Sequence, residues 1–201
     1  MFRLTERFED VFTYDGHDYR LDLSFDNVLR TQELMKDETF NELERIYILF
    51  EMLVTNPPDN LDIYKKGVIV RLIFQTFIYE DNYDNSDDGT TERLLDMEED
   101  ADYIYASFLQ DYGIDLFGMQ GKLHWKQFKA LLSGLRDNTK FKQVVSIRSR
   151  KVPNPTRYNK EYRDQLIKLK RIYALDQTNI TADDIDRKFD RVANMLRPQG
   201  R

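Results

Sequence analysis

Apolar side chains recur every three or four positions along most of this sequence, which is the spacing that places them on one face of an α-helix. The clearest series is Phe40, Leu43, Tyr47, Phe50 and Val54. It predicts a helix that begins at Asp37 and buries this stripe. The helix should end before Asn56-Pro57-Pro58, because a residue that precedes proline disfavours helical geometry. Most of such a chain should fold into packed helices.

Seven further segments carry helical spacing or a helix start signal. In the first half, helices should run from Ser24 to about Lys36 and from Asp59 to about Tyr79, the latter with a stripe of Leu61, Tyr64, Val68, Leu72 and either Phe77 or Ile73. In the second half, we expect a helix with the stripe Ala101, Ile104, Phe108 and Tyr112 that stops at Gly113, one holding residues 124–132, one from Thr139 to about Ser149, a basic one striped by Tyr158, Tyr162, Leu166, Leu169 and Tyr173, and a tail helix capped by Thr181.

Near the N-terminus, Asp15-Gly16 is a signal for a two-residue hairpin turn, because a type I′ turn needs positive φ at both central positions. Counting outward pairs Tyr14 with His17, Phe12 with Tyr19 and Phe8 with Leu23. All six side chains then share one face. A lone hairpin is marginally stable, so this face should rest on helices or on another chain. The expected fold is mainly α with an N-terminal β-hairpin.

The composition excludes several classes of protein. With 41% hydrophobic and 13% aromatic residues, the chain is too apolar to be disordered. It has no Cys, which excludes disulfide frameworks and thiolate metal sites. The acidic residues of MFRLTERFEDVF do not suit a signal peptide, and no run approaches the roughly 18 apolar residues of a membrane span. We therefore expect a soluble protein of the cytoplasm with no membrane contact.

Charge is strongly segregated along the chain. Residues 80–102 hold eleven acids and one base, whereas residues 140–171 hold eleven bases and two acids. This asymmetry fits an interaction surface, a contact between the two segments, or two solvated faces. The polar run 80–93 predicts a division into residues 1–80, an acidic flexible connector over 81–95, a helical domain over 96–175 and a tail helix over 176–201.

Residues suited to catalysis are few. The two histidines, His17 and His124, are far apart in sequence and have no metal-ligand spacing around them, so packing or capping explains them better. The motifs GxSxG and GxxxxGK[ST] are absent from the sequence. Asp84, Ser86 and Asp88 match the first half of a calcium loop, but Leu95 stands where the bidentate Glu should be. We expect a protein that is not an enzyme and that holds no metal or cofactor.

A basic surface is predicted in the second half. Its members are Arg148, Arg150, Lys151, Arg157, Lys160, Arg163 and Lys168. Such a stripe could bind phosphates, yet Tyr158 and Tyr162 fall at helical spacing, which favours core packing over base stacking. The rest of the chain is acidic and would repel a nucleic acid, so nucleic-acid binding is the disfavoured interpretation.

Several runs in the second half resemble the bacteriophage gene-product-fifteen family. They are DADYIYASFLQDYGIDL from Asp100, LHWKQFKALLSGL from Leu123, TKF at residues 139–141, IRS at residues 147–149 and KLKRIYAL ending at Leu175. The N-terminal hairpin and helices fit the same layout, so the resemblance extends to about residue 175. Family members often have a second tryptophan where Lys126 follows Trp125 here.

The resemblance implies a role as a tail assembly chaperone. Members are typically encoded between the tail tube gene and the tape-measure gene of long-tailed phages and prophages. The implied partners are the tape-measure protein and the major tail tube protein, with a homo-oligomer as a further expectation. The alternatives are a structural component retained in the virion tail and a nucleic-acid-binding accessory protein that uses residues 140–171. The chaperone would act in the host cytoplasm.

Binding of an apolar partner requires apolar surface. The candidate partner-binding residues are Phe12, Tyr14, Tyr19, Tyr103, Tyr105, Trp125 and Phe128. Aromatic residues at helical spacing also suit a core, and this explains Trp125 better than a surface role. Tyr105 should lie at the edge of the stripe formed by Ile104 and Phe108.

Overall fold

The computed structural model describes residues 4–5, 7–8, 10–79, 94–176, 187 and 190. The predicted acidic connector lies almost wholly outside this part of the chain, as do Asp84, Ser86 and Asp88 and the tail helix. Contacts divide the chain into two compact units. Of the described residues, those between 4 and 79 and those from 120 to 128 belong to unit 1, and residues 94–119 and 129–176 belong to unit 2.

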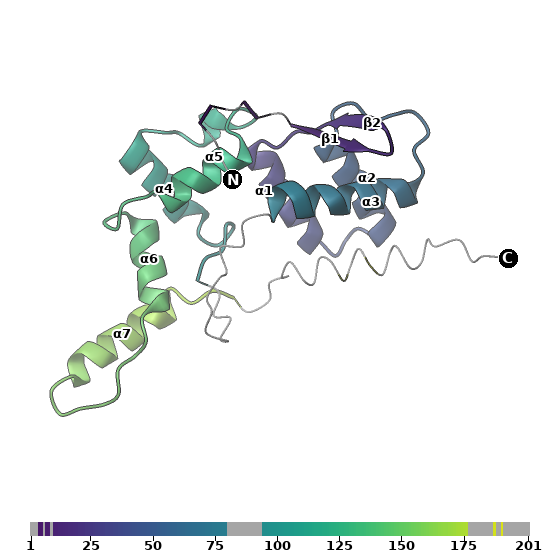
Figure 1. Cartoon of the computed structure of the whole chain (residues 1–201). Helices are drawn as coiled ribbons and strands as arrows, with labels where there is room; N and C mark the ends of the chain where they lie inside the picture. The colour runs from purple at the N-terminus through teal and green to yellow at the C-terminus, as the bar shows by residue number, and fades with distance from the viewer. Residues whose placement is uncertain are drawn as a thin grey trace. The chain divides into compact units, whose positions relative to one another are not determined.

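The predicted β-hairpin is confirmed in unit 1. Strands β1 (Val11–Tyr14) and β2 (His17–Arg20) pair in the expected register, with Phe12 opposite Tyr19 and Tyr14 opposite His17. Asp15 and Gly16 have φ of 51° and 76°, as a type I′ turn requires. The ladder ends at Val11 and Arg20 and does not reach Phe8 and Leu23. Beyond it, the N–H of Leu21 donates to Asp10 O at 2.7 Å, and Leu21 also forms an isolated bridge to Val54. The hairpin rests on helices, with the Tyr19 and Phe50 rings edge to face (Figure 1).

Three α-helices and a π-helix complete the first part of unit 1. They are α1 (Phe25–Lys36), α2 (Glu42–Leu53), α3 (Ile63–Ile73) and η1 (Phe74–Ile78). The expected starts of α2 at Asp37 and of α3 at Asp59 are wrong. Asp37 accepts hydrogen bonds from Thr39 in a local turn, while Asn41 and Asp62 cap the two helices. In each case the helix begins after a later residue whose side chain accepts the capping hydrogen bond.

The buried side of α3 also differs from the predicted stripe. Ile73, one of the two predicted alternatives for the last position, is buried together with Ile69, Val70 and Phe74. Tyr64 is exposed, and Leu61, Val68 and Leu72 are half-buried, so the rest of the true stripe is one position out of phase with the predicted one. Both series have helical spacing, so spacing alone could not choose between them.

A segment distant in sequence completes unit 1. The N–H of Phe25 donates to Leu123 O at 2.9 Å, and the N–H of Trp125 donates to Leu23 O at 2.8 Å. The ring of Phe128 stacks on Phe25 with 5.0 Å between centroids. Helix α5 (Trp125–Ser133) therefore begins within unit 1. The linear division predicted from the sequence had placed this segment with the second half.

Unit 2 contains α4 (Ala101–Tyr112), the short 3-10 helix η2 (Phe117–Met119), α6 (Lys140–Ser149) and α7 (Lys160–Ile172) (Figure 1). The expected stop of α4 at Gly113 is confirmed, with φ of 65°. Ser107 joins α4 to α6 by accepting a hydrogen bond from the N–H of Phe141. Among the described residues, no helix combines the length and apolarity needed to cross a bilayer.

Candidate protein-binding surfaces

Three of the predicted partner-binding residues lie in the core of unit 1. Tyr19, Trp125 and Phe128 are all buried. The indole N–H of Trp125 donates to Ile78 O at 3.3 Å, and its ring stacks on Phe128. These residues therefore hold unit 1 together and offer no exposed surface, which corrects their assignment as partner-facing.

The other four predicted residues are half-buried. Phe12 meets Phe77 edge to face, and Tyr14 is stacked beside Phe12. In unit 2, Tyr103 meets Tyr173 edge to face, and Tyr105 lies against exposed Phe117. Their role in binding remains a prediction.

His124 has the predicted capping and packing role. Its Nδ1 accepts a hydrogen bond from the N–H of Lys126 at 3.0 Å, and its own N–H donates to the Gln127 side chain. This arrangement satisfies helix donors at the start of α5. The ring stacks on Phe8 at 4.0 Å, and Nε2 lies 2.9 Å from Asp10 Oδ1.

An apolar surface that the sequence did not predict covers the outer side of α2. We call Phe40, Leu43, Tyr47 and Ile48 the α2 patch. The first three are exposed and Ile48 is half-buried. With Glu44 they line an open hollow of about 490 Å³. Of the predicted stripe, only Phe50 and Val54 are buried. The rest is exposed because α2 turns Ile46, Leu49 and Leu53 toward the core.

Local contacts fix this face of α2. Asn41 Oδ1 accepts hydrogen bonds from the N–H groups of Leu43 and Glu44, and Glu44 accepts one from the N–H of Asn41, each at 3.0 Å. This reciprocal capping box holds the first turn. The ammonium group of Lys66 lies 4.1 Å from the centroid of the Tyr47 ring and pairs with Glu51 at 2.8 Å. The patch is thus presented on an anchored helix.

The surroundings of the α2 patch are acidic. Residues 37–51 contain five acids and one base, Arg45. Arg45 is buried and donates to the backbone oxygens of Asp37 and Phe40. Hydrogen bonds from the side chain and backbone of Thr39 hold the pKa of Asp37 below its ordinary value, so this carboxylate is charged at neutral pH.

Helix α7 is basic, unlike the acidic surroundings of the α2 patch, and it also exposes an apolar row. Leu166 is its one buried residue, while Tyr162, Leu169 and Ile172 are exposed. We call these three the α7 ridge. Their separations of seven and ten residues bring them to one side of the helix. Tyr158, just before α7, is 92% exposed. The interpretation of Tyr158 and Tyr162 as core residues is therefore wrong.

Polar contacts hold the C-terminal end of α7. Lys170 Nζ donates to the backbone oxygens of Arg148 and Arg150 at 2.6 and 2.8 Å. Arg148 Nε donates to Tyr173 O at 2.6 Å, and Lys140 Nζ to the Tyr173 hydroxyl at 2.6 Å. These bonds fix the helix on α6 with little apolar burial.

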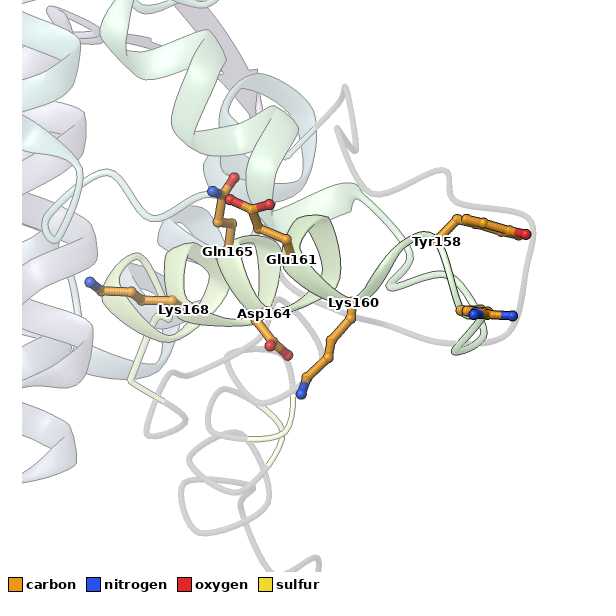
Figure 2. A pocket seen from close by; sticks show the side chains of 7 residues that line it. Tyr158, Lys160, Glu161, Asp164, Gln165 and Lys168 are labelled. Carbon is orange, nitrogen blue, oxygen red and sulfur yellow. The ribbon is translucent and has the colours of Figure 1, made fainter.

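The predicted basic surface needs one correction. Arg148 is buried and forms two hydrogen bonds to the carboxylate of Asp100, at 2.6 and 2.8 Å. Arg163 is half-buried, and the other five residues are exposed. Three of them, Arg157, Lys160 and Lys168, line an open hollow of about 610 Å³ beside Glu161 and Asp164. Figure 2 shows Lys160 and Asp164 on the same side of α7, with Tyr158 projecting from the preceding loop.

The fold and these surfaces define a mainly helical protein that exposes two apolar helix faces and a basic surface. The model of the bacteriophage Gp15 protein family matches residues 4–175, so the chain belongs to this family. The match confirms the resemblance found in the sequence and its extent. No curated protein and no solved structure matches the chain.

Proposed function

We propose that this protein is a tail assembly chaperone that binds the tape-measure protein and the tail tube subunits in the cytoplasm of the host bacterium. Membership of a bacteriophage protein family supports the setting. The observation that carries the proposal is the presence of two exposed apolar helix faces, the α2 patch and the α7 ridge. In this proposal the protein acts by binding and catalyses no reaction.

Apolar faces suit the task because a tape-measure protein exposes long amphipathic helices before the tube closes around it. Burial of apolar surface supplies affinity without a fixed sequence pattern. The net charge of −6 limits aggregation of the chaperone itself. Faces of three or four side chains favour weak contacts that can be released when the tube assembles.

Co-expression with the tape-measure gene of the same phage tests the proposal. The soluble fraction of tape-measure protein should rise with the wild-type chain and fall with a double variant that charges both faces, Leu43→Lys with Ile172→Glu. A control double variant, Leu109→Lys with Ile167→Glu, changes exposed apolar residues outside the two faces and should retain the effect. No gain in solubility with the wild-type chain would refute the chaperone role.

Two alternatives make different predictions. A structural tail component should be present in purified virions at fixed stoichiometry, whereas a chaperone should be missing. Nucleic-acid binding gains one supporting observation, since Tyr158 is exposed beside Arg157 and Lys160 and could stack on a base. That alternative predicts retention on DNA that weakens steeply with salt.

A further inference from the structure

The α2 patch and the α7 ridge are both apolar and are complementary in charge. The α2 patch lines an open hollow, and the α7 ridge is a row of exposed side chains on a helix. Residues 37–51 hold five acids against one base, and Lys66 of α3 adds a second base over Tyr47, whereas α7 holds five bases against two acids. The two helices have 12 and 13 residues, which makes each about 20 Å long. Each surface therefore offers apolar side chains of similar extent and a charge opposite to that of the other.

We propose that the α7 ridge of one copy binds the α2 patch of a second copy. Tyr162, Leu169 and Ile172 would cover Phe40, Leu43 and Tyr47, while exposed Lys168, at the edge of the ridge, approaches exposed Glu38. Burial of the apolar residues drives the contact, and the charges set its orientation. This inference goes beyond the proposed function, because it concerns association of the chain with itself.

The contact is heterologous, since it joins two different surfaces. A dimer formed this way leaves one α2 patch and one α7 ridge unoccupied, so further copies can add in a ring or an open row. One helix on one apolar face gives an interface at the small end of the known range. The expected affinity is micromolar, and the association should weaken as salt concentration rises.

Sedimentation velocity on the full chain tests the proposal. The wild-type protein should associate in a concentration-dependent manner above micromolar concentration. Leu43→Lys on α2 and Ile172→Glu on α7 should each raise the dissociation constant about tenfold or more. Each removes an apolar contact and places a charge opposite residues of the same sign in the other copy.

Matched controls separate this effect from a general change of surface charge. Leu109 is 48% exposed and Leu43 is 44% exposed, so Leu109→Lys is the control for Leu43→Lys. Ile167 lies on α7 away from the ridge and is 37% exposed, so Ile167→Glu is the control for Ile172→Glu. Both controls should associate like the wild type. All four variants change exposed residues, and their circular dichroism spectra should match the wild type.

Mixing the two defective variants gives the sharpest test. The Leu43→Lys copy keeps a working α7 ridge, and the Ile172→Glu copy keeps a working α2 patch. An equimolar mixture should therefore form dimers at concentrations at which neither variant does so alone. A wild-type protein that stays monomeric, two variants that still associate alone, or a mixture that stays monomeric would each overturn the proposal. Protection of α7 from hydrogen exchange that appears only when DNA is added, and not with rising protein concentration, would also overturn the proposal.

Discussion

Helices α2 and α7 are almost equal in length, and each exposes an apolar row, but they are held in place differently. Five residues of α2 are buried, and a capping box fixes its first turn. In α7 only Leu166 is buried, and its N-cap residue Asn159 makes no capping bond. The difference shows that an exposed apolar row can be presented in two ways, on a core helix or on a helix tied down by polar contacts.

A substitution in the core beneath α2 should have the largest effect on stability. Phe50 is fully buried, and Phe50→Ala leaves a cavity that should lower the free energy of unfolding by about 4 kcal/mol. Trp125 is the single tryptophan and packs within unit 1, so its fluorescence during urea unfolding reports this unit. Leu43→Ala on the same helix is exposed and should change stability by less than about 0.5 kcal/mol. Equal effects would show that the patch is not exposed in solution.

Breaking the polar support of α7 should have the next largest effect. Arg148→Met leaves the carboxylate of Asp100 buried without its partner and removes the bond to Tyr173 O. We expect a loss of roughly 3 kcal/mol in unit 2. Hydrogen exchange measured by mass spectrometry should show faster exchange in α4, α6 and α7. Arg150→Met, at an exposed position next along the segment, should leave exchange unchanged.

The features that could be predicted from the sequence are those set by local chemistry. The Asp15-Gly16 turn and the stop of α4 at Gly113 both depend on a few neighbouring residues. Each has a backbone preference strong enough to act without the rest of the fold. Thr139 is the N-cap residue of α6 as predicted, although its hydroxyl donates to Arg136 O and makes no capping bond. The family resemblance likewise depended on short runs of residues and was confirmed.

The features that could not be predicted depend on distant partners. Arg148 has the sequence environment of a surface base, yet Asp100, 48 positions away, buries it. The segment around Leu123 joins unit 1 through backbone bonds to α1 and the residues before it. The phase of α2 follows from which side meets the core, and the rows through Tyr47 and through Leu49 are both apolar. The candidate surface was missed for this reason.

A smaller effect tests whether the capping box orients the α2 patch. Asn41→Ala removes the acceptor for the N–H groups of Leu43 and Glu44, and should cost about 1 kcal/mol in the tryptophan-detected unfolding of unit 1. Asn41→Ser should restore most of this stability, because serine is a comparable N-cap. If alanine and serine give the same stability, the first turn of α2 is held by other contacts.

The smallest expected effect is on the pKa of one carboxyl group, compared between the two units. The side chain of Arg136, and then its backbone N–H, donate hydrogen bonds to Asp111 and hold the pKa of Asp111 below its ordinary value. In unit 1, Asp37 has a lowered pKa through Thr39 instead. Arg136→Ala should raise the pKa of Asp111 toward the ordinary value while that of Asp37 stays unchanged, as followed by carboxyl NMR titration.

The direction of the pH dependence follows from these lowered pKa values. A carboxyl group with a depressed folded-state pKa stabilises the fold above its unfolded-state pKa and loses this contribution as the pH falls through the folded value. The bond between Asp111 and Arg136 therefore contributes at neutral pH and is lost in acid. Arg136→Ala should destabilise unit 2 slightly at neutral pH and converge with the wild type at low pH. A difference that grew with acidity would show that Arg136 acts on another group.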